Sequence, residues 1–80
     1  MDVEHLVGMA NQIAEFFDAE QGPEEAFRPV SSHIARYWDP RMRRAIIQHV
    51  SEGGAGLLPT ARKAIQSLPP VKPTPEKLAG

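Results

Sequence analysis

The stretch Trp-Asp-Pro-Arg-Met-Arg-Arg, residues 38–44, sets a helix boundary near the middle of the chain. Proline pushes the residue before it out of the α region, so a helix that precedes Asp39 must end there. Asp39 can cap a new helix whose first position is Pro40, because proline is pre-organised for that position. This helix is predicted from about Pro40 to Glu52, where Gly53-Gly54 ends it. Its inward-facing residues are expected to be Met42, Ile46, Ile47 and Val50.

The N-terminal segment predicts a helix over residues 3–20. Its apolar residues recur at alternating spacings of three and four, which is the period of an amphipathic helix and not of a strand. Asp2 is a suitable N-cap, and Gly22 followed by Pro23 is a typical helix end. The stripe consists of Val3, Leu6, Ala10, Ile13 and Phe17, and Met9 and Phe16 widen it.

A second helix is predicted between these two, starting at Pro23 with the carboxylates of Glu24 and Glu25 at its positive end. Pro29 is its difficulty. A proline inside a helix removes one hydrogen bond and clashes with the preceding turn at a cost of about 3 kcal/mol, so we expect a kink or a late start. The predicted buried face comprises Phe27, Val30, Ile34, Tyr37 and Trp38.

The C-terminal part divides into a short helix and a proline-rich tail. The helix is predicted to start at Pro59 and to bury Ala61, Ile65 and Leu68, although Leu58 offers no polar N-cap. Residues 69–80 read PPVKPTPEKLAG, which is typical of a polyproline-like, disordered segment. With no alternating runs that suggest a sheet, the sequence predicts an all-α domain over residues 1–68 with three main helices and a short fourth, followed by a flexible tail over residues 69–80.

Length and composition narrow the function classes. The chain has 80 residues, 41% of them hydrophobic and 24% charged, which indicates a soluble domain with a thin core and disfavours a self-contained enzyme with a deep pocket. It has no cysteine, which excludes disulfides, thiolate nucleophiles and cysteine-ligated metal centres. No stretch approaches the roughly 20 apolar residues of a membrane span, and no basic signal segment begins the chain, so we expect a cytoplasmic protein.

Charge is unevenly distributed along the chain although the net charge is only -1. Residues 1–27 hold seven acids and no base, whereas residues 28–63 hold seven bases against Asp39 and Glu52. Three of these bases, Arg41, Arg43 and Arg44, fall in the first turns of the predicted helix 40–52, where the helix dipole disfavours each cation by about 0.3–1 kcal/mol. Residues that oppose a local preference such as this one, without an evident gain in stability, mark a candidate functional site.

We therefore predict a partner-binding site at the start of this helix. Arginine binds carboxylates and phosphates in a forked geometry and is weakly hydrated, which suits it to interfaces. Trp38 and Met42 would supply apolar contact area. The alternatives are that the acids of the same chain neutralise the arginines and that Trp38 lies mainly in the core. The predicted site consists of Trp38, Asp39, Arg41, Met42, Arg43 and Arg44.

Other chemistry-bearing residues give weaker patterns. His5, His33 and His49 have no second metal ligand three or four positions away, so no zinc site is predicted. The serines beside His33 do not occupy a strained nucleophile turn, and the glycines of residues 53–56 lack the strand and the lysine of a phosphate-binding loop. The sequence therefore predicts no catalytic, metal or cofactor site in this chain.

Several segments together resemble the delta subunit of NAD-dependent formate dehydrogenase. The resemblance covers about residues 4–68, and its most specific part is the run from Trp38 to Arg43. The remaining segments are Met9-Ala10-Asn11-Gln12-Ile13, Phe16-Phe17, His33-Ile34, and Gly56-Leu57 before Pro59.

This resemblance implies a small non-catalytic subunit or assembly factor of a soluble molybdenum enzyme that oxidises formate and reduces NAD. It implies that molybdopterin guanine dinucleotide, iron–sulfur clusters and flavin are held by larger subunits, and that the partner is the catalytic alpha subunit. One alternative is a nucleic-acid-binding module that uses the helix 40–52, although a net charge of -1 argues against it. Another alternative is a structural bundle that associates with itself.

Overall fold

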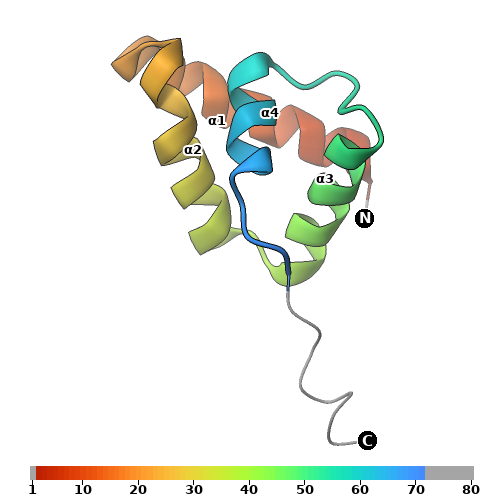
Figure 1. Ribbon diagram of the computed structural model, residues 1–80. Helices are drawn as coiled ribbons and strands as arrows, with labels where there is room; N and C mark the ends of the chain where they lie inside the picture. The colour runs from red at the N-terminus through yellow and green to blue at the C-terminus, as the bar shows by residue number, and fades with distance from the viewer. Residues whose placement is uncertain (1, 72–80) are drawn as a thin grey trace, which may run out of the picture.

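The computed structural model describes residues 2–71. It contains four helices, and this part of the chain has no strand, so the predicted all-α fold is confirmed (Figure 1). The helices are α1 (Val3–Gln21), α2 (Pro23–Tyr37), α3 (Pro40–Ser51) and α4 (Pro59–Gln66).

The helix boundaries follow the predicted capping residues. The Asp2 carboxylate accepts a hydrogen bond from the Glu4 N–H at 3.1 Å, and the Asp39 carboxylate accepts one from the Met42 N–H at 3.0 Å. Gly22, with φ 86°, separates α1 from α2. That left-handed conformation costs glycine little and a residue with a Cβ much more, which explains the short connection.

Pro29 does not delay the start of α2. We expected a kink or a late start; the helix runs from Pro23 to Tyr37 with Pro29 inside it, so it does not start late, and the kink stays a prediction. Pro29 leaves the Glu25 carbonyl without its helical N–H donor, but Glu25 lies on the surface, where water can satisfy that carbonyl. Val30 and Ile34 are fully buried, and burial of this face holds the helix together despite the proline.

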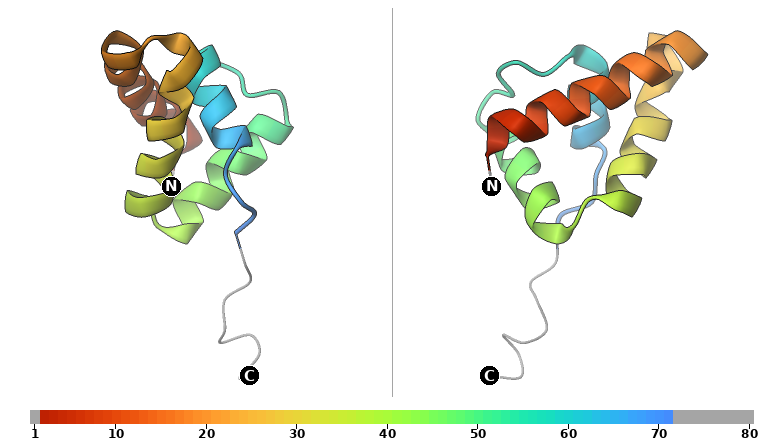
Figure 2. Two further views of the ribbon diagram at one scale, coloured as in Figure 1. Left: turned by 60° about the vertical axis from the view of Figure 1, so that its left-hand side comes forward. Right: turned by 180° about the vertical axis from the view of Figure 1, so that it is seen from behind.

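The helices enclose one hydrophobic core. Seen from behind, α1, α2 and α3 form three sides of a frame, and α4 packs against its other face (Figure 2). Trp38 is 5% exposed and lies in this core, whereas Tyr37, also predicted to face inward, is 67% exposed. The core consists of Leu6, Ala10, Ala14, Val30, Ile34, Trp38, Ile46, Leu57, Ala61, Ala64, Ile65 and Leu68.

The connection from α3 to α4 is held by a side chain of α1. The Asn11 amide donates to the Gly56 carbonyl at 2.9 Å and accepts from the Leu58 N–H at 2.9 Å. Asn11 thus satisfies backbone groups of the connection just before α4 begins, where Leu58 provides no side-chain cap. This contact could not be predicted from the sequence, because the partners lie more than forty positions apart.

The fourth helix agrees with its prediction. It begins at Pro59, and Ala61, Ile65 and Leu68 are buried. Residues 69–71 continue without helix, and the rest of the predicted tail, residues 72–80, lies outside the described residues. The division into a domain over 1–68 and a tail therefore stays a prediction.

Candidate partner-binding surfaces

The corner between α2 and α3 is built by main-chain and capping hydrogen bonds. The Trp38 N–H donates to the Ile34 carbonyl at 3.1 Å and closes α2, and the Arg43 N–H donates to the Asp39 carbonyl at 3.0 Å and opens α3. The Asp39 carboxylate is engaged with the Met42 N–H. The only acid within residues 38–44 is therefore used to start a helix and fixes the direction in which the arginines of α3 leave it.

Four arginines surround this corner, and they carry no ion pair with the described residues. The ion pair found within residues 2–71 joins Arg28 to Glu25 at 3.1 Å, away from the corner. Arg43 is half-buried, and its Nε is out of contact with solvent and has no hydrogen-bond partner among residues 2–71. The alternative of internal neutralisation thus receives no support from this part of the chain. The arginine corner consists of Arg36, Arg41, Arg43 and Arg44, of which Arg36, Arg41 and Arg44 are exposed.

The two predicted apolar contacts at the corner differ in accessibility. Trp38 is 5% exposed and lies in the core, as the alternative for this residue expected, and its role as a contact for a partner stays a prediction. Met42 is half-buried and packs against the edge of the core. Its thioether remains available as an adaptable apolar contact.

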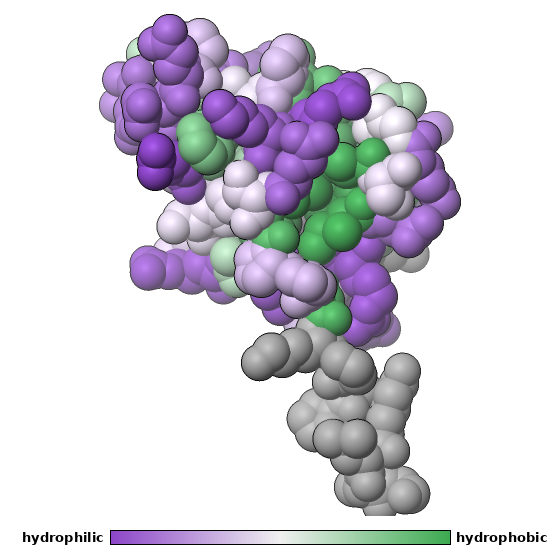
Figure 3. Space-filling view, viewed as in Figure 1, coloured by the Kyte–Doolittle hydropathy of each residue, from purple (hydrophilic) through white to green (hydrophobic). Residues whose placement is uncertain are grey.

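A hydrophobic area lies on the face between α4 and α3 (Figure 3). Met42 and Ala45 of α3 and Leu58 before α4 are half-buried hydrophobic residues packed on the core. Helix α3 therefore combines half-buried apolar residues with exposed cations at Arg41 and Arg44. Partner surfaces commonly pair apolar contacts with a polar, charged rim.

Asp18, an acid near the turn between α1 and α2, has a partner within the chain. The Thr60 hydroxyl donates to the Asp18 carboxylate at 2.7 Å, and Thr60 is 5% exposed. This contact ties the end of α1 to the first turn of α4, where the positive helix end favours a carboxylate. Asp18 therefore contributes to the fold, a role that its place in an acidic segment did not indicate.

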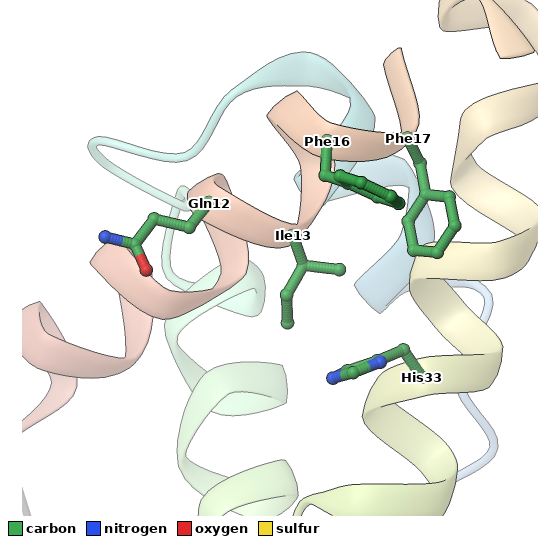
Figure 4. A pocket seen from close by; sticks show the side chains of 5 residues that line it. All are labelled: Gln12, Ile13, Phe16, Phe17 and His33. Atoms are coloured by element: carbon green, nitrogen blue, oxygen red, sulfur yellow. The ribbon is translucent and has the colours of Figure 1, made fainter. Parts of the chain in front are cut away.

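A hollow with aromatic side chains lies between α1 and α2, and the sequence did not predict it. It has a volume of about 370 Å³ and is lined by Gln12, Ile13, Phe16, Phe17 and His33 (Figure 4). The Phe16 and Phe17 rings meet edge to face with centroids 5.0 Å apart. Phe16 was predicted to widen the buried stripe of α1, but it is 59% exposed. Adjacent aromatic residues on a helix point in directions about 100° apart, so Phe16 and Phe17 cannot both face the core.

A second hollow of about 320 Å³ continues the first along α2. It shares Phe17 and His33 with the first and extends to Arg36 and Tyr37. The rings of His33 and Tyr37 lie 4.8 Å apart. We call the two hollows together the aromatic groove.

The histidines do not form a metal site with other described residues. Within residues 2–71 no three His, Cys, Asp or Glu side chains gather closely enough to hold a metal ion. His49 Nε2 lies 2.8 Å from the Ala55 carbonyl, and His33 lines the aromatic groove. Since the chain also has no cysteine, these residues do not fit an iron–sulfur cluster.

None of the helices in residues 2–71 has both the length and the apolar character needed to cross a membrane.

Comparison with known families gives a match between residues 5–65 and the family model of the NADH-dependent formate dehydrogenase delta subunit, FdsD. No curated protein and no solved structure matches the chain. The family match spans most of the chain and extends from α1 to the last turn of α4, and it confirms the resemblance seen in the sequence. The chain therefore belongs to the FdsD family of formate dehydrogenase delta subunits.

Proposed function

We propose that this chain is a non-catalytic subunit or assembly factor of a soluble NAD-dependent molybdenum formate dehydrogenase, and that it docks on the catalytic alpha subunit. Membership of the delta-subunit family supports a place in such a complex. In this proposal the molybdopterin guanine dinucleotide, the iron–sulfur clusters and the flavin belong to larger subunits. The lack of cysteine in all 80 residues agrees with that division.

The observation that carries the docking proposal is the arginine corner without an ion pair in residues 2–71. Arg41, Arg43 and Arg44 stand in the first turns of α3, where the helix dipole opposes positive charge. The fold thus loses free energy by placing them there and regains none through the ion pairs found. Carboxylates of a partner would form charge-assisted, forked hydrogen bonds with these guanidinium groups.

Apolar contact and positioning complete the proposed interface. Met42 lies between Arg41 and Arg43 and is half-buried, so it would add an apolar contact beside the charged ones. Asp39 acts indirectly, because its capping hydrogen bond sets the start of α3 and hence the positions of the arginines. Stable docking would stabilise the catalytic subunit, and transient docking would let the same guanidinium groups hold cofactor phosphates during insertion.

The experiment reverses the exposed charges of the corner. The variant Arg41→Glu with Arg44→Glu is expected to lose co-purification with the formate dehydrogenase complex and to keep its helical circular dichroism. The fold should survive because acids in the first turns of α3 interact favourably with the helix dipole. Co-purification and formate oxidation are measured from cells that express the complex with each variant.

A matched control carries the same change of net charge elsewhere. Arg28→Glu with Lys63→Glu reverses two exposed cations outside the corner, and this variant is expected to co-purify as the unmodified chain does. Undiminished co-purification of the corner variant would refute the proposed interface, and equal loss in both variants would show that total charge matters and the corner does not.

A further inference from the structure

The aromatic groove carries an interaction surface that the docking proposal does not use. Phe16 and Tyr37, at 59% and 67% exposure, are the large exposed hydrophobic residues among those described, and both belong to this groove. No described residue covers it. Contiguous exposed apolar surface on a soluble protein commonly marks a binding site for another protein.

The charges at the two ends of the groove are of opposite sign. Glu20 follows Phe16 by four positions on α1, and Glu25 precedes Pro29 by four on α2, so both acids lie on the helix faces that line the groove. At the other end, Arg36 lines the groove itself. A segment lying along the groove must therefore offer positive charge at one end and negative charge at the other.

We propose that a second copy of this chain covers the aromatic groove. In an isologous dimer the same surface meets itself in the opposite direction. With the two α2 helices antiparallel and the two-fold axis near Val30, about midway between Glu25 and Arg36, the end of each copy that carries Glu20 and Glu25 faces Arg36 of the other. The chain therefore supplies both the apolar area and the reversed charges that the groove requires.

This interface takes Arg36 from the arginine corner but none of the three arginines that form the proposed docking contacts, Arg41, Arg43 and Arg44. It buries Phe16, His33 and Tyr37 along α1 and α2, and it leaves Arg41 and Arg44 of α3 exposed. A delta-subunit dimer could therefore present two arginine corners to two catalytic subunits. The inference does not depend on the proposed docking, and the two can fail independently.

The first test measures the mass of the full-length chain by sedimentation from about 1 μM to about 1 mM, a range that covers weak protein association. The average mass is expected to rise from one chain toward two, and the rise should shift to higher concentration as salt is added, because exposed ion pairs are screened. A mass of one chain at every concentration overturns the proposal.

The second test exchanges charges across the proposed axis. Glu20→Arg alone or Arg36→Glu alone places like charges opposite each other and should weaken dimerisation by at least about tenfold. The variant with both exchanges restores opposite charges and should recover most of the affinity. If the losses of dimerisation free energy in the two single variants simply add in the double variant, this pairing is ruled out.

The third test removes the apolar contacts. Phe16→Ser with Tyr37→Ser should abolish dimerisation without loss of helix, whereas Ala19→Ser with Ala35→Ser, at exposed positions of the same helices outside the groove lining, should not. A dimer that is unchanged in the first variant overturns the proposal. A monomeric chain that loses co-purification with the complex through the same variant also overturns it, since the groove then binds another subunit.

Discussion

The two ends of α2 use their charges in opposite ways. At its start, Glu24 and Glu25 lie at the positive helix end, and Glu25 pairs with Arg28. Nearby, Asp18 binds the Thr60 hydroxyl. At its end, the arginine corner has no ion pair in residues 2–71. Two acids of the acidic end are thus used by the fold, whereas no ion pair within residues 2–71 uses the arginines of the basic end.

Distance explains why one end does not neutralise the other. Helix α2 has 15 residues and is therefore about 22 Å long. This length exceeds the Debye length of about 8–10 Å at physiological ionic strength. The low net charge of the chain thus hides two charged regions that act separately, and a partner meets each of them as a distinct surface.

The largest effect is expected from a core residue at the basic end. Trp38→Ala should destabilise the protein by about 3–5 kcal/mol, because it empties a large volume in a small core. Stability is measured by urea unfolding followed by circular dichroism. A loss of this size would equal a large part of the free energy of unfolding of a small domain.

Tyr37→Ala is the matched control, since it removes the neighbouring aromatic ring from an exposed position. We expect a change of less than about 1 kcal/mol. Comparable losses in the two variants would contradict the division between a buried and an exposed aromatic residue. A stable Trp38→Ala variant that fails to co-purify would support the prediction that Trp38 contacts a partner.

A smaller loss is expected at the acidic end. Asp18→Ala should cost about 1.5–3 kcal/mol, because it removes a charge-assisted hydrogen bond and leaves the buried Thr60 hydroxyl without its acceptor. Thr60→Val keeps the shape but removes the hydroxyl, so it should cost less. The double variant completes a cycle whose coupling free energy should be clearly above zero. Additive effects would show that Asp18 does not hold α4 to α1.

The helices could be predicted because their signals are local. Asp2, Gly22 and Asp39 act on neighbouring backbone groups, and the apolar period of α1 is visible within a few turns. The same local rule predicts a kink or a late start at Pro29, and the late start does not occur because burial of Val30 and Ile34 outweighs the lost hydrogen bond. Tertiary contacts thus decided the case in which they opposed a local preference.

The candidate surfaces could be predicted only in part. The arginines stood out because their positions oppose a local electrostatic rule. The aromatic groove did not, because Phe16 fits the apolar stripe of α1, and Tyr37 fits that of α2, as well as their buried neighbours do. Which residues of a wide stripe stay exposed depends on how much of it the other helices cover. The contacts of Asn11 and Asp18 depend in the same way on segments far apart in the sequence.

The smallest effect tests the comparison most directly. Arg41→Gln with Arg44→Gln should leave the stability unchanged or raise it by up to about 1 kcal/mol, because each substitution removes a cation from the positive end of α3. Glu24→Gln with Glu25→Gln should lower it by a similar amount, since it removes acids from the favourable end of α2 and breaks the pair with Arg28. Both differences should shrink in high salt, as expected for exposed charges. Urea unfolding at low and high salt measures them, and a loss of stability in the arginine variant would mean that the corner serves the fold of its own chain.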